Sequence, residues 1–430
     1  MQIRQSIKDV VNWAMGLLSK PIYLGLSVLL FFTPLVISND TNELFEFPKS
    51  YFIYFLGMGL FALALTIIVL TKRRIVWFSL PVFLFFAVNA VSTVFSVHTY
   101  TSFWGYYTRF NDGLFSLIVF LAIYFVCRNW TDEALTARLI KISALTVIPV
   151  SIVGIFQHYS LGSGFDAVDR VFSTFGQPNW LAQYLAMLLP IILYFAVIGS
   201  WVVWGVIFIL GFACLWFTFS VSGILGFILA IILFFVVLAY KKILNKKSLV
   251  KPFSVLVFCA IFALANAGLY QNKVQDMLKD LKLSLKNIST VYAQSEDGHS
   301  LSDPGFIRLG LWKGALELFK SSPKIIFIGT GPETFPYAFQ KFRPESLNYS
   351  SEWNYVFNKP HNYYLETLTE TGIFGLAVYL WLIIKLLKKA PFYIIPAITG
   401  FLVTNTFGWP VTETALLFWI WLGLFEGRKL

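Results

Sequence analysis

Four histidines and three arginines are the side chains in this sequence best suited to acid–base and anion chemistry. The histidines are His98, His158, His299 and His361, and the arginines, each beside Gly or aromatic residues, are Arg109, Arg170 and Arg308. A guanidinium binds phosphates through paired hydrogen bonds, and an imidazole can accept a proton near neutral pH. The set therefore favours an anionic substrate; the alternative is that the arginines simply contact lipid headgroups.

The stretch HNYYLETLTETGIFG, residues 361–375, is the most informative one. If it is helical, Asn362, Glu366 and Glu370 fall at intervals of four and form one polar stripe on an otherwise apolar helix. Ionisable groups within a membrane span are costly and usually face a cavity or a partner. We therefore expect this stripe to be functional, with His361 at the mouth of the helix. The alternative is that both Glu residues lie above the hydrocarbon in a short outer helix.

The usual signatures of soluble enzymes are missing. The chain has no P-loop, no GxSxG, no HExxH and no Asp-x-Asp to hold a metal on a nucleotide-sugar diphosphate. Its three cysteines, Cys127, Cys214 and Cys259, lie in apolar runs without CxxC spacing, so neither zinc binding nor a disulfide framework is expected. We predict no metal site and no cofactor.

Composition predicts the scaffold that must position these residues. Hydrophobic residues make up 57% of the 430-residue chain and charged residues 13%, with mean hydropathy +0.71. Ordinary soluble domains have about 45–50% apolar residues and about 25% charged residues. A helix needs about 20 mostly apolar residues to cross a bilayer. The chain is therefore predicted to be an all-α integral membrane protein with about 12 transmembrane helices, at 21–38, 50–71, 76–96, 113–127, 139–157, 180–198, 201–219, 222–240, 252–269, 364–384, 391–407 and 411–426.

The distribution of positive charge predicts the orientation. The net charge of +11 would suggest nucleic acid in a soluble protein, but Lys and Arg cluster between apolar runs, as the positive-inside rule expects. With both termini cytoplasmic, 19 of the 33 Lys and Arg lie inside, and only Lys49, Arg109 and Arg170 fall in short outer loops. Membrane lipids, and not nucleic acid, are the expected surroundings.

Three regions follow from this topology. Residues 1–269 hold nine spans, preceded at 1–20 by an amphipathic helix on the inner surface; 270–361 form one large extracytoplasmic loop; and 362–430 hold the last three spans. The first apolar run, with no cleavage site after it, is expected to stay as an anchor. In the loop, Leu278, Leu281 and Leu285 indicate a helix on the outer leaflet, and Ser302-Asp303-Pro304 begins a second short helix. GTGPETF at 329–335 then breaks regular structure.

Four blocks of this sequence resemble the O-antigen ligase and Wzy-type polymerase superfamily. The blocks are His361-Asn362 followed after nine residues by Gly372-x-x-Gly375, the segment from Arg170 to Leu185 that contains Asn179, Arg308-x-x-x-Trp312 leading into 329–335, and, more weakly, Trp104 to Gly113 with Arg109. Together they cover about 104–375. Their order, with the large loop between the same two blocks, is similar to that of the family.

The resemblance implies a metal-independent membrane glycosyltransferase of the bacterial cytoplasmic membrane, with its active site on the extracytoplasmic face. Such enzymes take a glycan from an undecaprenyl-diphosphate carrier and pass it to a hydroxyl of lipid A-core, of another glycan or of a protein. His361, Arg308 and Arg170 are then expected to be catalytic: the arginines would clamp the diphosphate, and His361 would accept or orient the acceptor proton. The residues expected to bind substrate are Arg109, Asn179, Asn362 and Glu366.

Other functions remain open at this stage. A flippase or transporter of lipid-linked glycans would also collect cations at the outer leaflet, but it should show broken or charged helices in two repeated halves, and no such repeat is visible. A scaffold of envelope assembly would not need the clustered Arg and His. Polymerase, ligase and O-linked protein oligosaccharyltransferase are not separated, because nothing in 271–360 indicates an acceptor.

Overall fold

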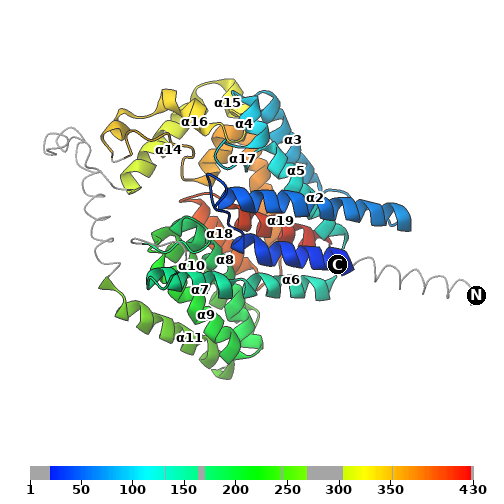
Figure 1. Ribbon diagram of the computed structural model, residues 1–430, viewed down its shortest axis with the longest axis vertical. Helices are drawn as coiled ribbons and strands as arrows, with labels where there is room; N and C mark the ends of the chain where they lie inside the picture. Colours follow the sequence, from blue (N-terminus) through cyan, green and yellow to red (C-terminus); the bar gives the residue numbers. More distant parts are fainter. Residues whose placement is uncertain are drawn as a thin grey trace, which may run out of the picture.

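The computed structural model describes residues 20–130, 132–162, 170–243, 246–268, 304–350 and 352–427, and the regular elements in these ranges are all helices (Figure 1). Five helical stretches are long and apolar enough to cross a membrane, and several shorter apolar helices accompany them. The prediction of an all-helical membrane protein is confirmed at this level. The number of spans and their sidedness stay predictions.

A helix lies at each of the twelve predicted spans, with ends that differ by a few residues. In chain order the helices are Lys20–Leu35, which ends in the 3-10 turn η1 (Thr33–Leu35), α2 (Glu46–Thr71), α3 (Leu80–Val94), α5 (Leu114–Asn129), α6 (Glu133–Leu145) continued by α7 (Val147–His158), α8 (Pro178–Ile198), α9 (Trp201–Phe217), α10 (Val221–Tyr240), α11 (Lys246–Ala265), α17 (Tyr363–Lys389), α18 (Ile395–Asn405) and α19 (Thr412–Gly427). The short α4 (Thr99–Trp104) connects α3 to α5.

Serine caps divide the long apolar stretch 180–240 into three helices. The Ser200 side chain accepts a hydrogen bond from the backbone N–H of Val203 at the start of α9. Ser220 does the same for Gly223 at the start of α10, at 3.2 Å. These caps satisfy amide groups that have no partner within the first turn, so a polar break as short as one serine is enough to begin a new helix.

Helix α8 lies at the centre of the packing. Its side chains are buried almost all round, as expected for a helix that is apolar on every face, and it packs against α9, α10 and α18. Gly400 of α18 permits the close approach: a Cβ there would lie 2.7 Å from the carbonyl oxygen of Ala186. Elsewhere in the bundle α5 packs between α2 and α19.

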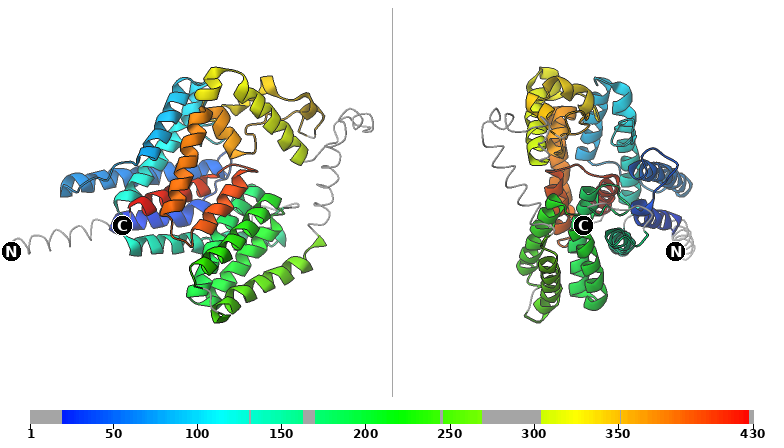
Figure 2. Two further views of the ribbon diagram at one scale, coloured as in Figure 1. Left: turned by 180° about the vertical axis from the view of Figure 1, so that it is seen from behind. Right: turned by 60° about the vertical axis from the view of Figure 1, so that its left-hand side comes forward.

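A small helical cap covers one end of the bundle. It consists of α14 (Pro304–Lys320), α15 (Pro323–Phe327), α16 (Phe335–Ala338) and the 3-10 turns η2 (Phe339–Phe342) and η3 (Glu345–Tyr349). The cap has its own apolar core, made by Ile307, Leu311, Ala315, Leu318, Phe335, Phe339, Leu347 and Phe357. Helix α17 extends from this cap into the bundle (Figure 2), and both α14 and α15 pack against it.

Two predictions for the loop are confirmed, and two others cannot be compared with the structure. A helix does begin at Pro304, and the stretch 329–335 is irregular up to the short α16. The amphipathic helices expected at 1–20 and around Leu278 fall on residues that, apart from Lys20, lie outside the described ranges.

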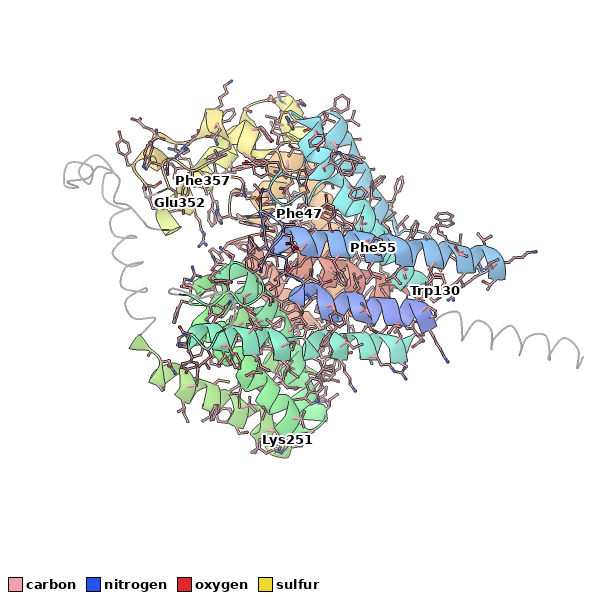
Figure 3. The ribbon with its side chains drawn as sticks, in the orientation of Figure 1. Phe47, Phe55, Trp130, Lys251, Glu352 and Phe357 are labelled. Atoms are coloured by element: carbon pink, nitrogen blue, oxygen red, sulfur yellow. The ribbon has the colours of Figure 1, made fainter. Side chains whose placement is uncertain are left out.

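The cation-bearing helix ends lie together at the end of the molecule opposite the cap. Arg128 and Lys385 both form ion pairs with the nearly buried Glu426. The Arg73 guanidinium lies 4.8 Å from the Trp130 ring, and Trp130 lies far from Glu352 and Phe357 of the cap in Figure 3. Segments that the charge count assigns to one side of the membrane therefore share one end of the bundle.

Lys49 departs from the charge-based prediction. It was expected in a short outer loop, but α2 begins at Glu46, so Lys49 lies in the first turn of that helix. Its ammonium is fully buried, 2.6 Å from Glu413 Oε1 of α19 and 2.6 Å from the carbonyl oxygen of Thr174. An internal acidic partner explains why this lysine does not obey a rule that concerns solvated loops.

Candidate functional site

His361 lies directly before α17, in a left-handed backbone conformation (φ 54°) that non-glycine residues rarely adopt. Its ring packs against Trp409 from the α18–α19 connection, with 5.1 Å between ring centroids. The imidazole lines a small pocket together with Gln177, Asn179, Trp180, Gln183, Ser222, Thr404, Phe407, Gly408 and Trp409. Backbone strain at such a residue persists only where the surroundings enforce it, and it is common at functional sites.

Arg109 lies beside the same pocket. Its guanidinium is 4.7 Å from the Trp180 ring and 5.9 Å from the Trp409 ring. The loop that carries it is tightly wound: Asp112 has φ 61° and Gly105 has φ 97°. Position 105 requires glycine, because a Cβ there would lie 2.1 Å from the carbonyl oxygen of Asn111. Arg109 and His361 therefore share one tryptophan, although 252 positions separate them in the sequence.

Arg170 is connected to the pocket through Asn179. Its Nη2 donates to Asn179 Oδ1 at 2.9 Å, and its Nε donates to the carbonyl oxygen of Thr218 at 2.9 Å. Asn179 lines the pocket at the start of α8, where Gln177 caps the helix by accepting from two backbone amides. The two residues predicted from one block thus form one hydrogen-bonded unit.

Arg308 approaches His361 from the cap. In the same helix, α14, Trp312 Nε1 donates to the carbonyl oxygen of Pro360 at 3.1 Å, which fixes this helix against the residue that precedes His361. Burial and the charges of Arg308, Arg109 and Lys359 lower the pKa of His361 from its ordinary value near 6.5 to about 4. The imidazole is therefore neutral near neutral pH, within a positively charged environment.

The predicted polar stripe on α17 exists, and its members have different partners. Asn362 Oδ1 caps the helix by accepting from the amides of Tyr364 and Leu365 at 3.0 and 3.1 Å. Glu366 accepts from Lys359 Nζ at 2.7 Å. The two oxygens of Glu370 accept from the backbone amides of Glu333 and Phe335, at 2.9 and 3.2 Å. All three side chains of the stripe are buried.

Helix α17 is kinked at Gly372, where the sequence suggested a continuous helix. Gly372 has φ 70° and ψ −174°, and a Cβ there would lie 2.4 Å from the backbone of Phe327. The kink releases the carbonyl oxygens of residues 369 and 370 from their helical partners, and the amides of Thr330 and Gly331 bond to them at 3.0 and 2.9 Å. Gly372 therefore serves to dock the 329–335 loop onto the helix.

Lys359 is the main residue that the sequence did not single out. It is 2% exposed, and its ammonium pairs with Glu366, with Glu333 and, at 3.3 Å, with Asp112. Burial alone would lower the pKa of Lys359, yet these carboxylates raise it well above its ordinary value. Its partners lie in blocks that the sequence did mark, but no local spacing indicates that they meet. Trp409 had no sequence signal at all.

Three buried carboxylates, Glu333, Glu366 and Glu370, come close enough together to suit a metal ion. Most of their oxygens already have partners, however. Lys359 binds one oxygen each of Glu333 and Glu366, and backbone amides bind both oxygens of Glu370. The donor set is therefore better described as the binding site of an internal ammonium group.

Residues 206–380 match the family model described as O-antigen ligase. This match supports an O-antigen ligase or Wzy-type family. No curated protein matches the chain. The matched range contains Arg308, His361, Asn362 and Glu366, whereas Arg109, Arg170 and Asn179 precede it.

The O-antigen ligase domain indicates a glycosyltransferase-type enzyme of polysaccharide synthesis, with a lipid-linked glycan donor and a glycan acceptor in general. Together with the apolar helices it indicates a protein of the bacterial inner membrane. In the structure His361 and Asn179 line one pocket. Arg109 lies over two of its tryptophans, Arg170 bonds to Asn179, and the charge of Arg308 acts on His361. Asn362 and Glu366 follow His361 at the start of α17. The Asn362 side chain accepts from backbone amides of that helix, and Glu366 accepts from Lys359.

Glu370 offers a test of this architecture that does not depend on activity. Glu370→Ala should lower the free energy of unfolding by about 2–5 kcal/mol, because two buried amides lose their side-chain acceptors, the two oxygens of this carboxyl group. Glu370→Gln keeps one acceptor oxygen and should lose about half as much. Thermal unfolding in detergent measures both, with the exposed Glu345→Ala as the matched control. If Glu370→Ala melted at the wild-type temperature, the docking of the 329–335 loop onto α17 would not depend on this carboxylate.

Proposed function

We propose that the protein transfers a glycan from an undecaprenyl-diphosphate carrier to an acceptor hydroxyl on the extracytoplasmic face of the membrane, without a metal ion. The observation that carries the proposal is a pocket lined by a neutral imidazole, with the charges of Arg109 and Arg308 acting on that imidazole and with Arg170 bonded to the pocket residue Asn179. A diphosphate leaving group needs fixed positive charge, and an attacking hydroxyl needs a proton acceptor.

The reaction follows from these parts. The acceptor oxygen attacks the anomeric carbon of the donor glycan, the bond from that carbon to the diphosphate oxygen breaks, and the hydroxyl proton passes to the neutral His361. Arg170, Arg308 and Arg109 stabilise the charge that develops on the departing diphosphate. Because Arg308 and Arg109, in addition to burial, depress the basicity of His361, a bound diphosphate that neutralises these two cations makes the imidazole a better proton acceptor.

The acceptor distinguishes three forms of the same proposal. A hydroxyl of lipid A-core makes the protein a ligase, a hydroxyl of a second lipid-linked glycan makes it a polymerase, and a serine or threonine hydroxyl makes it a protein glycosylase. Purified protein in liposomes, given the labelled donor with each acceptor in turn, separates the three by the size and chemistry of the labelled product. Passage of the intact donor across the bilayer, with no product, would instead indicate a transporter.

The arginine clamp predicts a specific mutational pattern. Arg308→Ala and Arg170→Ala should each reduce transfer by about 10²–10³-fold, as removal of a charge-stabilising donor does in other enzymes. Lys at either position should restore little, because an ammonium cannot form the paired hydrogen bonds of a guanidinium. Initial rates at equal amounts of inserted protein measure the effect.

Lys341→Ala is the suitable control for the clamp, because this cap residue is exposed. Arg343 is unsuitable, since its guanidinium holds the carbonyl oxygen of Trp353 at 2.6 Å and lies over Phe357. Near wild-type transfer by Arg308→Ala would remove that residue from the clamp.

His361 should act as a neutral imidazole. His361→Ala should lose about 10²–10⁴-fold in rate without loss of insertion, whereas His361→Gln should retain activity only if the side chain orients the acceptor without taking its proton. With a pKa of about 4, the imidazole stays neutral as the pH falls below 6.5 and becomes protonated only as the pH approaches 4. The value of kcat/KM, which reports the free enzyme, should therefore change by less than about twofold from pH 7.5 to 5.5, whereas a histidine with the ordinary pKa would lose about tenfold.

The exposed His98, which stacks on Tyr337, provides the matched control as His98→Gln. Full activity of both His361 variants would exclude His361 from the mechanism. A wild-type kcat/KM that halves near pH 6.5 would contradict the depressed basicity of His361 in the free enzyme.

A further inference from the structure

The strongest unassigned feature of the protein is the environment of Lys359, two residues before His361. The lysine is buried, and its ammonium reaches carboxylates of three different segments. Asp112 belongs to the loop of Arg109, Glu333 to the 329–335 loop, and Glu366 to α17. The ammonium also lies 5.6 Å from the ring of Trp409. One cation thus lies against four of the segments that surround His361 and Arg109.

Lys359 has no means of binding the donor directly. Its three N–H donors are matched by three carboxylate partners, at 2.7 Å for Glu366, 3.3 Å for Asp112 and a shorter contact for Glu333. The side chain is 2% exposed. A phosphate would have to displace an acidic partner from a buried position, so the ordinary role of a lysine near a phosphate site does not fit this residue.

The carboxylates around Lys359 depend on its positive charge. Several carboxylates face the cluster, and Lys359 is the cation they enclose; the acidic residues are Asp112, Glu333, Glu366 and Glu370. Within the part of the chain that the structure describes, Glu366 Oε2 has no hydrogen-bond partner, so the carboxylate depends on the ammonium bound to its other oxygen. Removal of one member of a buried ion pair leaves an uncompensated charge at low dielectric, and the segments that carry the charges then separate or admit water.

We propose that Lys359 is a positioning residue that sets the distance between Arg109 and His361 by clamping the segments that carry them. The inference rests on the proposed function, because the two residues act there on the donor and on the acceptor proton. Lys359 acts through Asp112 on the loop of Arg109, and through Glu366 on the first turn of α17, where His361 enters. Misplacement of a reacting group by about 1 Å typically costs about 10²-fold in rate.

A double-mutant cycle tests the clamp. Lys359→Met keeps the length of the side chain without its charge and should reduce transfer by about 10²-fold. Glu366→Gln added to Lys359→Met removes the charge left uncompensated, and the double variant should recover at least about tenfold of that loss. A lysine that bound the diphosphate would show no such recovery, because neutralising a carboxylate cannot replace a phosphate ligand. Lys359→Arg, which keeps the charge, should be less impaired than Lys359→Met.

The melting temperatures of the same four proteins (wild type, Lys359→Met, Glu366→Gln and the double variant), measured without substrate, give a second readout. The two substitutions should be coupled, with the double variant melting above Lys359→Met. If Lys359→Met does not accumulate in the membrane, the double variant and Lys359→Arg still report the clamp. The exposed Lys341→Met is the matched control and should behave as the wild type in both measurements.

The outcomes separate the two claims. Coupled melting temperatures with no transfer by the wild type would overturn the proposed function and leave the clamp intact. Wild-type transfer together with full activity of Lys359→Met, or a double variant as impaired as Lys359→Met, would overturn the clamp alone.

Discussion

One buried ammonium among several carboxylates is the constraint on which the site end of this protein depends. An isolated charge is very costly away from water, so each acidic residue near Lys359 requires the lysine, and the lysine requires them. Because Asp112, Glu333 and Glu366 come from three separate segments, this requirement fixes two loops and the start of α17 at once. The kink at Gly372 and the carboxylate of Glu370 then dock the cap onto α17. The ion pairs of Lys359 therefore fix the relative positions of these segments, and burial strengthens the pairs because it removes them from water.

A second buried ion pair stabilises the other side of the Arg109 loop. Lys49 pairs with Glu413, while Glu46 accepts hydrogen bonds from the backbone and side chain of Thr412 at 3.1 and 2.7 Å. Asn111, two residues after Arg109, donates to the same threonine at 3.3 Å. The loop is therefore held at Asn111 by this network and at Asp112 by Lys359. Ionisable groups inside a membrane bundle are costly unless they are paired, and both networks have their polar groups directed inward, beside the pocket.

The parts of this protein that follow local rules could be predicted from its sequence. Apolar length located a helix at every predicted span, the Ser302-Asp303-Pro304 signal located α14, and the spacing of Asn362, Glu366 and Glu370 indicated their common burial. The clamp could not be predicted, because Lys359 finds its partners only after folding, and an isolated lysine before Pro-His resembles a solvated loop residue. Trp409 was missed for the same reason: it meets Arg109 and His361 through tertiary packing. The kink of α17 likewise depends on Gly372 having Phe327 as a neighbour.

The central claim is that this pocket transfers a glycan from a lipid diphosphate with the positive charge of arginine in place of a metal ion. The most direct measurement is the balance of products from purified protein in liposomes that contain the labelled polyprenyl-diphosphate glycan, a hydroxyl acceptor and excess chelator. The account predicts that free polyprenyl diphosphate and glycosylated acceptor appear in equal amounts, at a rate that added Mg²⁺ does not raise. Release that requires Mg²⁺, or loss of donor without a matching glycosylated product, would contradict it.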